Sequence, residues 1–149
     1  MYTQKLNKNW NMRRVGDEDF QTAVVPGTVY TDLLRNGRME DPFFKDNEDT
    51  ALKLMDEDYE YCATFDCEKE VMGARHQILH FDGIDTIADL YLNSTRLGEV
   101  CNMHRTWEYD VTGMIHETGN ELRVVFHSPT KYIAKAFEIS QTHGSEDAM

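Results

Sequence analysis

The pattern that most restricts the fold is a period-two alternation of apolar and polar residues, which recurs between residues 59 and 127. In 59–66 the tyrosines, Ala63 and Phe65 occupy alternate positions, and Leu122, Val124 and Phe126 do the same near the end. Neighbouring side chains of a strand point to opposite faces of a sheet, so each such segment predicts a half-buried strand. The expected strands are 59–66, 76–82, 86–92, 97–100, 107–111 and 122–127.

Turn residues separate these segments at intervals of about ten residues, which is typical of an antiparallel sandwich or barrel. Asn93-Ser94-Thr95-Arg96 predicts a hairpin, and Gly119-Asn120 predicts the turn before the last strand. Crossover helices between strands are missing, which argues against a parallel α/β sheet. In 86–92 the alternation leaves two possibilities: either Ile87 and Tyr91, or Ala88, Leu90 and Leu92, face the core. The expected core is Leu79, Phe81, Ala88, Leu90, Leu92, Leu122, Val124 and Phe126.

Two short helices flank the predicted strands. Thr28 is a plausible N-cap, apolar residues follow at helical spacing, and Asn36-Gly37 supplies a stop, which together predict a helix over 28–36. A second helix is expected over 131–140. We interpret the segment before Val24 and the segment 39–50 as loops, and 141–149 as a loop or frayed tail. A length of 149 residues favours one domain, 1–149.

Charge and cysteine content exclude several classes of function. Acidic residues outnumber basic ones 27 to 15, and the net charge of −12 disfavours nucleic acid and anionic membranes as partners. No apolar run approaches the roughly 20 residues of a membrane helix, and the N-terminus lacks the apolar core of a signal peptide. The three cysteines form no Cys-x-x-Cys pair. A reduced, cytoplasmic protein without a metal or other cofactor is therefore expected.

Several residue groups have chemical potential but are better interpreted as structure. His76, His80 and Asp82 share one strand face, yet the two histidines lie about 13 Å apart, too far to bind one ion. The acidic run 56–58 is interpreted as a solvated loop, because consecutive carboxylates seldom converge on one bond. Asn93-Ser94-Thr95 matches a glycosylation sequon, but the turn explains it better. Trp10, Trp107 and the tyrosines could stack on sugar rings, although core packing is the better interpretation.

A set of phrases, in matching order from about Trp10 to Ala134, resembles the N-terminal domain of β-mannosidases of glycoside hydrolase family 2. The block 81–93 and the Asn102-Met103-His104-Arg105 phrase are its most specific parts. The phrases are Val25-Pro26-Gly27-Thr28-Val29-Tyr30, Asp32-Leu33-Leu34, Asp41-Pro42-Phe43-Phe44, Asn47-Glu48, Phe81-Asp82-Gly83-Ile84-Asp85-Thr86-Ile87-Ala88-Asp89-Leu90-Tyr91-Leu92-Asn93, Leu97-Gly98, Asn102-Met103-His104-Arg105, Tyr109-Asp110-Val111-Thr112, Asn120-Glu121-Leu122 and Ser128-Pro129.

The resemblance implies an all-β jelly-roll sandwich similar to galactose-binding domains, with one or two short helices. In that family the domain leans against a (β/α)8 barrel that carries the two catalytic glutamates of a retaining glycosidase. The sequence ends before the Gly-Trp-Asp-Trp-Gly-Pro-like stretch of the family. We therefore expect a partial domain that lacks its final strands and has open sheet edges suited to self-association.

The resemblance also implies four candidate sugar-contacting positions: Asn47, Asn102, His104 and Arg105. No residue of the chain is expected to be catalytic. The leading hypothesis is a non-catalytic domain that braces the barrel of a β-mannosidase-like enzyme and helps to shape its cleft for a mannoside. A freestanding carbohydrate-binding module is the alternative, and a small enzyme built on His76, His80 and Asp82 is a weaker third.

Overall fold

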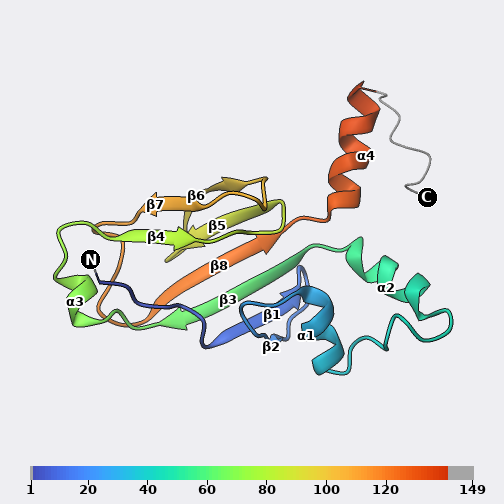
Figure 1. The fold of residues 1–149 in the computed structure, drawn as a ribbon, viewed down its shortest axis with the longest axis horizontal. Coiled ribbons are helices and arrows are strands. Elements are labelled where there is room, and N and C mark those ends of the chain that lie inside the picture. Colours follow the sequence, from blue (N-terminus) through green and yellow to red (C-terminus); the bar gives the residue numbers. More distant parts are fainter. Residues whose placement is uncertain (1, 141–149) are drawn as a thin grey trace.

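The structure is a computed structural model that describes residues 2–140, and Figure 1 shows their arrangement. The segment 141–149, expected to be a loop or tail, lies outside the described residues. The described strands are β1 (Trp10–Arg14), β2 (Gln21–Thr22), β3 (Tyr59–Phe65), β4 (Ile78–Phe81), β5 (Ala88–Leu92), β6 (Thr95–Val100), β7 (Trp107–Asp110) and β8 (Asn120–Phe126). The helices are α1 (Val29–Arg35), α2 (Asn47–Met55), α3 (Lys69–Met72) and α4 (Pro129–Ser140).

The strands form two antiparallel sheets that pack as a sandwich. The larger sheet has the order β2-β1-β3-β8-β5-β6, and β4 pairs with β7 in the smaller one. A Cβ atom added to Gly98 of β6 would lie 3.1 Å from the ring of Tyr109 in β7, so the smaller sheet rests directly on the larger. Every strand pair among residues 2–140 is antiparallel. The predicted all-β sandwich is confirmed, but the described residues form four helices where one or two were expected.

The core lies between the sheets and follows the predicted alternation. Of the two possibilities for 86–92, the structure selects Ala88, Leu90 and Leu92, which are fully buried, and Ile87 before the strand is buried as well. Phe81 and Phe126, expected in the core, are only partly buried at its margin. Buried apolar side chains outside the expected set include Trp10, Met12, Leu33, Met39, Tyr59, Tyr61, Ile84, Val100 and Val111.

The loop prediction for the N-terminal segment is wrong, because β1 and β2 lie there. β1 buries Trp10 and Met12 and pairs along its whole length with β3. Its strand signal covers only five residues, and the partner is about fifty positions away in the chain. Strand formation there depends on a long-range pairing that local pattern does not reveal.

The loop prediction for 39–50 is wrong at its end, because α2 begins at Asn47. The sequence of this helix lacks a clear apolar stripe, and only Ala51 is buried. Glu48 and Asp49 in the first turn and Lys53 in the last are placed to complement the helix dipole. Likewise the short helix α3 occupies part of the expected connection 71–75.

The helix expected over 28–36 spans Val29–Arg35 and starts with a capping box. The Thr31 amide donates to Thr28 Oγ1 at 3.2 Å, and the Thr28 amide donates to Thr31 Oγ1 at 3.1 Å. We expect Thr28→Ala to lower the free energy of unfolding by about 1 kcal/mol, the usual value of such a cap. Chemical denaturation measures it. Thr50→Ala, within α2, is the matched control, and an equal loss from both variants would contradict a capping role for Thr28.

The β5–β6 hairpin turns through Asn93 and Ser94, whose φ angles are 48° and 66°. Asn93 Nδ2 donates to the Met114 carbonyl at 2.8 Å and to Asn120 Oδ1 at 3.0 Å, while its Oδ1 accepts the Glu121 amide. The side-chain amide of Asn93 is thus committed to binding the hairpin to the start of β8. This supports the interpretation of the sequon as a turn.

Candidate functional site

Three of the four candidate residues come from a connection at the end of the sandwich where several strands meet. Tyr59 pairs with Phe126, Phe126 with Ala88, and Ala88 with Val100, which aligns these strand ends across the larger sheet. Phe81 and Trp107 pair at the neighbouring end of the smaller sheet. In Figure 1 this is the end from which α4 projects. The connections that leave it are 15–20, 56–58, 82–87, 101–106 and 127–128.

The β6–β7 loop at this end has a defined internal structure. Asn102 Oδ1 accepts the His104 amide at 2.8 Å, which closes an Asx turn, and Trp107 Nε1 donates to the Asn102 carbonyl at 3.1 Å. The Arg105 guanidinium lies 4.2 Å from the centre of the Trp107 ring. A Cβ atom on Gly83 would lie 3.0 Å from the Met103 carbonyl, so the β4–β5 connection packs against this loop.

The structure brings three of the four predicted positions together and separates the fourth. Asn102, His104 and Arg105 share the β6–β7 loop and are exposed. Asn47 is the first residue of α2, and its Nδ2 donates to the Asp41 carbonyl at 2.9 Å. Figure 1 shows α2 lying beside the sheets and away from the β6–β7 loop, and Asn47 begins this helix. The exposed Arg and His can donate hydrogen bonds to hydroxyls, whereas the Asn102 side chain already holds its own turn.

The two tryptophans differ in their availability for stacking. Trp10 is only 6% exposed, and its Nε1 donates to the Leu6 carbonyl at 2.8 Å. Trp107 is half-buried, with Arg105 over its ring. Trp10 is therefore a core residue, and Trp107 presents at most a partial face.

The histidine face of β4 does not form a metal centre. His76 precedes the strand, which begins at Ile78. His80 lies between two carboxylates, with Nδ1 3.0 Å from Glu108 and Nε2 3.0 Å from Asp82. These hydrogen bonds, first that to Glu108 and then that to Asp82, raise the pKa of His80. In the described part of the chain, no three His, Cys, Asp or Glu side chains are grouped to hold a metal ion.

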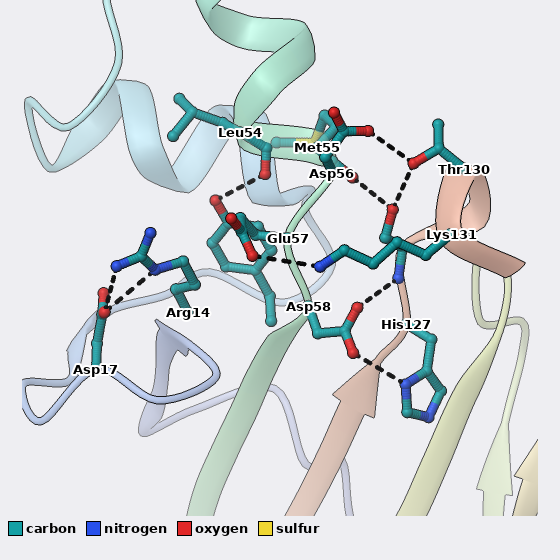
Figure 2. Close-up of polar contacts among 12 residues, drawn as sticks. Arg14, Asp17, Leu54, Met55, Asp56, Glu57, Asp58, His127, Thr130 and Lys131 are labelled. Atoms are coloured by element: carbon teal, nitrogen blue, oxygen red, sulfur yellow. Dashed lines mark hydrogen bonds and ion pairs between the residues drawn. The ribbon is translucent and has the colours of Figure 1, made fainter. Parts of the chain in front are cut away.

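The acidic run 56–58 is not merely a solvated loop, because all three carboxylates contact the start of α4 (Figure 2). Asp56 Oδ1 accepts the Thr130 hydroxyl at 2.7 Å, and Glu57 Oε2 lies 3.3 Å from Lys131 Nζ. Asp58 Oδ1 accepts the Ser128 amide at 2.9 Å. We call these contacts between Asp56, Glu57 and Asp58 and the start of α4 the junction. It was not predicted from the sequence, although Ser128-Pro129 before the expected helix is a typical pair of N-cap and first helical residue.

His127 completes the junction from the end of β8. Its Nδ1 lies 3.3 Å from Asp58 Oδ2 and its Nε2 lies 3.0 Å from Asp89 Oδ2. Burial lowers the pKa of His127, but the hydrogen bonds to Asp89 and Asp58 outweigh it and the pKa is raised. For Asp89, burial raises the pKa, and the hydrogen bonds from His127 and Arg96 more than offset that, so the pKa is lowered.

Cys62 and Asp110 are two groups with chemical potential that the surrounding structure keeps in structural roles. Cys62 is partly buried, and burial together with the neighbouring Glu121 raises its pKa to about 11, so its thiol stays protonated and unreactive near neutral pH. The Thr112 amide donates to Asp110 Oδ1 at 3.0 Å, which forms an Asx turn after β7.

Within residues 2–140, no helix has the length and apolar character to cross a membrane.

Comparison with known proteins agrees with the fold. Residues 10–147 match the family described as glycosyl hydrolase 2 galactose-binding domain-like. Beta-mannosidase B of Thermothelomyces thermophilus is 32% identical over 126 residues, which cover 83% of this chain and 15% of that protein. The beta-mannosidase of Mus musculus is 25% identical over 85% of this chain and 14% of its own length. The chain thus spans about a seventh of the curated relatives it matches.

Solved structures of glycoside hydrolases also contain this fold. The beta-D-mannosidase of Dictyoglomus thermophilum superposes with a TM-score of 0.93 and 35% identity, covering 98% of this chain and 18% of that one. The exo-chitosanase CsxA of Amycolatopsis orientalis, at 20% identity and a TM-score of 0.67 over 79% of this chain and 16% of that one, shares the fold. The chain belongs to the glycosyl hydrolase 2 galactose-binding domain-like family.

Proposed function

We propose that the chain is the non-catalytic N-terminal domain of a β-mannosidase-type glycoside hydrolase, where it braces the catalytic barrel and forms one wall of the sugar cleft. The observation that carries the proposal is the superposition of 98% of this chain on 18% of the Dictyoglomus thermophilum beta-D-mannosidase. The described carboxylates support it as well. The carboxylates of the junction and the carboxylate that contacts His80 already have hydrogen-bond partners. This suits a structural role better than a role in general acid catalysis.

The β6–β7 loop is the part of the domain that we propose faces the sugar. Its Asx turn and its indole hydrogen bond fix the backbone, which leaves His104 and Arg105 exposed on a rigid loop. Polar groups fixed on rigid elements suit recognition of hydroxyls. Asn102 then acts by shaping the loop. Asn47 is a weaker candidate because its amide closes the turn before α2.

A chimera tests this proposal. This chain replaces the aligned segment of the Dictyoglomus thermophilum enzyme, and the chimera is assayed with 4-nitrophenyl β-D-mannopyranoside. We expect hydrolysis to persist, and Arg105→Ala to raise KM about tenfold with little change in kcat, because a charged hydrogen-bond donor to bound sugar is lost.

Arg75→Ala is the matched control, because Arg75 is exposed and lies between α3 and β4 at the opposite end of the sandwich. Equal KM values in the two variants would contradict a sugar-facing role for the loop. A folded chimera without hydrolytic activity would contradict the bracing role.

A freestanding carbohydrate-binding module is the competing proposal, and it depends on Trp107 alone because Trp10 is buried.

We further propose a cytoplasmic setting, supported by the absence of a disulfide among residues 2–140, where Cys62, Cys67 and Cys101 are all free. Self-association through the edge strands β2 and β6 also stays a prediction, and sedimentation velocity measures it.

A further inference from the structure

The imidazole of His127 connects three separate parts of the chain. One ring nitrogen faces Asp58, on the connection from α2 to β3, and the other faces Asp89, on β5. The second oxygen of each carboxylate is also engaged. Asp58 Oδ1 accepts the Ser128 amide at 2.9 Å, and Asp89 Oδ1 accepts from Arg96 Nε at 2.9 Å. The ring therefore stands between the sheet and the group that holds the start of α4.

This bridge requires a charged ring. An ionised carboxylate only accepts hydrogen bonds, and a neutral imidazole has one N–H and one lone pair. Both contacts of His127 are satisfied only when both ring nitrogens carry a proton. In the neutral form, one nitrogen lone pair faces a carboxylate oxygen, so the ring must give up one contact. The contact to Asp58, at 3.3 Å against 3.0 Å for Asp89, is the weaker of the two.

The contact to Asp58 matters for α4 because the acidic run holds the first turn of that helix. Figure 2 shows Asp56, Glu57 and Asp58 directed at Thr130, Lys131 and the Ser128 amide. Carboxylates at a helix N-terminus are stabilised by the helix dipole and by the amides that lack acceptors there. From this junction α4 projects away from the sheets (Figure 1). The contacts at its first turn join it to the acidic run.

We propose that protonation of His127 is a switch that fixes α4 to the sandwich: the charged ring bridges Asp58 and Asp89, and loss of its proton releases the Asp58 anchor and loosens the helix. The groups that face the ring are Asp58 from the α2–β3 connection and Asp89 from β5. Arg96 and Glu99 of β6 stand behind Asp89, and Asp56, Glu57 and Lys131 surround the helix start.

The direction of the pH dependence follows from the raised pKa of His127. A raised pKa means that the docked state binds the proton more tightly than the released state does. The stabilisation is complete below the ordinary value of 6.5 and is lost as pH rises through the pKa of the docked state. The equilibrium constant for docking of α4 changes by the ratio of the acid dissociation constants of His127 in the released and docked states. A difference of one pKa unit therefore corresponds to about a tenfold change in docking.

Amide hydrogen exchange of the whole chain, measured by NMR between pH 5.5 and 8.5 and corrected for intrinsic rates, tests the switch. We expect protection of the Ser128 and Tyr132 amides to fall as pH rises above 6.5, with the midpoint given by the His127 ring titration in the same sample. In His127→Gln, protection should be low and constant across the range. In Asp89→Asn, the change should shrink, because an amide partner tolerates a neutral ring.

His80→Gln is the matched control, since His80 also lies between two carboxylates but binds only the smaller sheet and the loop that follows β4. It should leave the pH dependence of α4 as in the wild type. Constant protection in the wild type while His127 titrates would overturn the proposal, as would an unchanged pH dependence in Asp89→Asn, a variant that retains the Asp58 contacts.

Discussion

Replacing Leu90 by alanine is expected to lower the free energy of unfolding by about 2–5 kcal/mol, the range measured for buried leucines. Leu90 is 0% exposed and lies in β5, which pairs with β8 on one side and β6 on the other. Three carbon atoms, Cγ and the two Cδ methyl groups, leave the core, and the neighbouring strands hold the cavity open. Urea denaturation followed by circular dichroism measures the loss.

Leu52→Ala makes the same chemical change at a site that is 57% exposed on α2. It should change stability by less than about 0.5 kcal/mol, because little apolar contact is lost and alanine favours helix. Similar losses for the two variants would show that β5 is not at the centre of the core.

Asp32→Ala is expected to cost about 2–4 kcal/mol, because hydrogen-bond donors packed around the carboxylate lose their acceptor at about 1–3 kcal/mol each. Asp32 is 0% exposed, and its carboxylate accepts the Val24 amide at 3.1 Å and the Tyr61 hydroxyl at 3.0 Å. It also pairs with Arg35. Burial and the Asp32 charge raise the pKa of Tyr61, which therefore remains a donor. Removing the carboxylate leaves the buried Tyr61 hydroxyl and the partly buried Val24 amide without this acceptor.

Two further variants separate the effect of the buried network from loss of charge. Tyr61→Phe removes one donor and should cost about 1 kcal/mol. Asp17→Ala removes a surface carboxylate paired with Arg14 and should cost at most about 1 kcal/mol. If Asp32→Ala is no more destabilising than Asp17→Ala, the network does not hold α1 to the sheet.

The strands that could be predicted from sequence are those with a clear alternation and a local partner. β5 and β6 share a tight hairpin, and β8 carries three apolar residues on one face, so pattern and structure agree. β1 was missed because it is only five residues long and its partner β3 lies far away in sequence. α2 was missed because only one of its residues is buried. Tertiary context decides such elements.

The candidate site divides in the same way. Resemblance pointed to the Asn102–Arg105 phrase, and the structure shows an exposed loop there that is held by two internal hydrogen bonds. The junction around His127 was not predictable, because its carboxylates lie about 70 and 40 positions away from the histidine in sequence. In a linear sequence, the acidic run 56–58 looks like any solvated charge cluster. Its contacts exist only because β3 and β8 are paired.

The most direct measurement is hydrolysis of 4-nitrophenyl β-D-mannopyranoside by the isolated chain beside the chimera described above. The reactive groups are proposed to reside outside this domain, so the isolated chain should give no turnover above the uncatalysed rate, while the chimera hydrolyses the substrate. Turnover by the isolated chain that disappears when one of its own carboxylates is replaced would contradict the account.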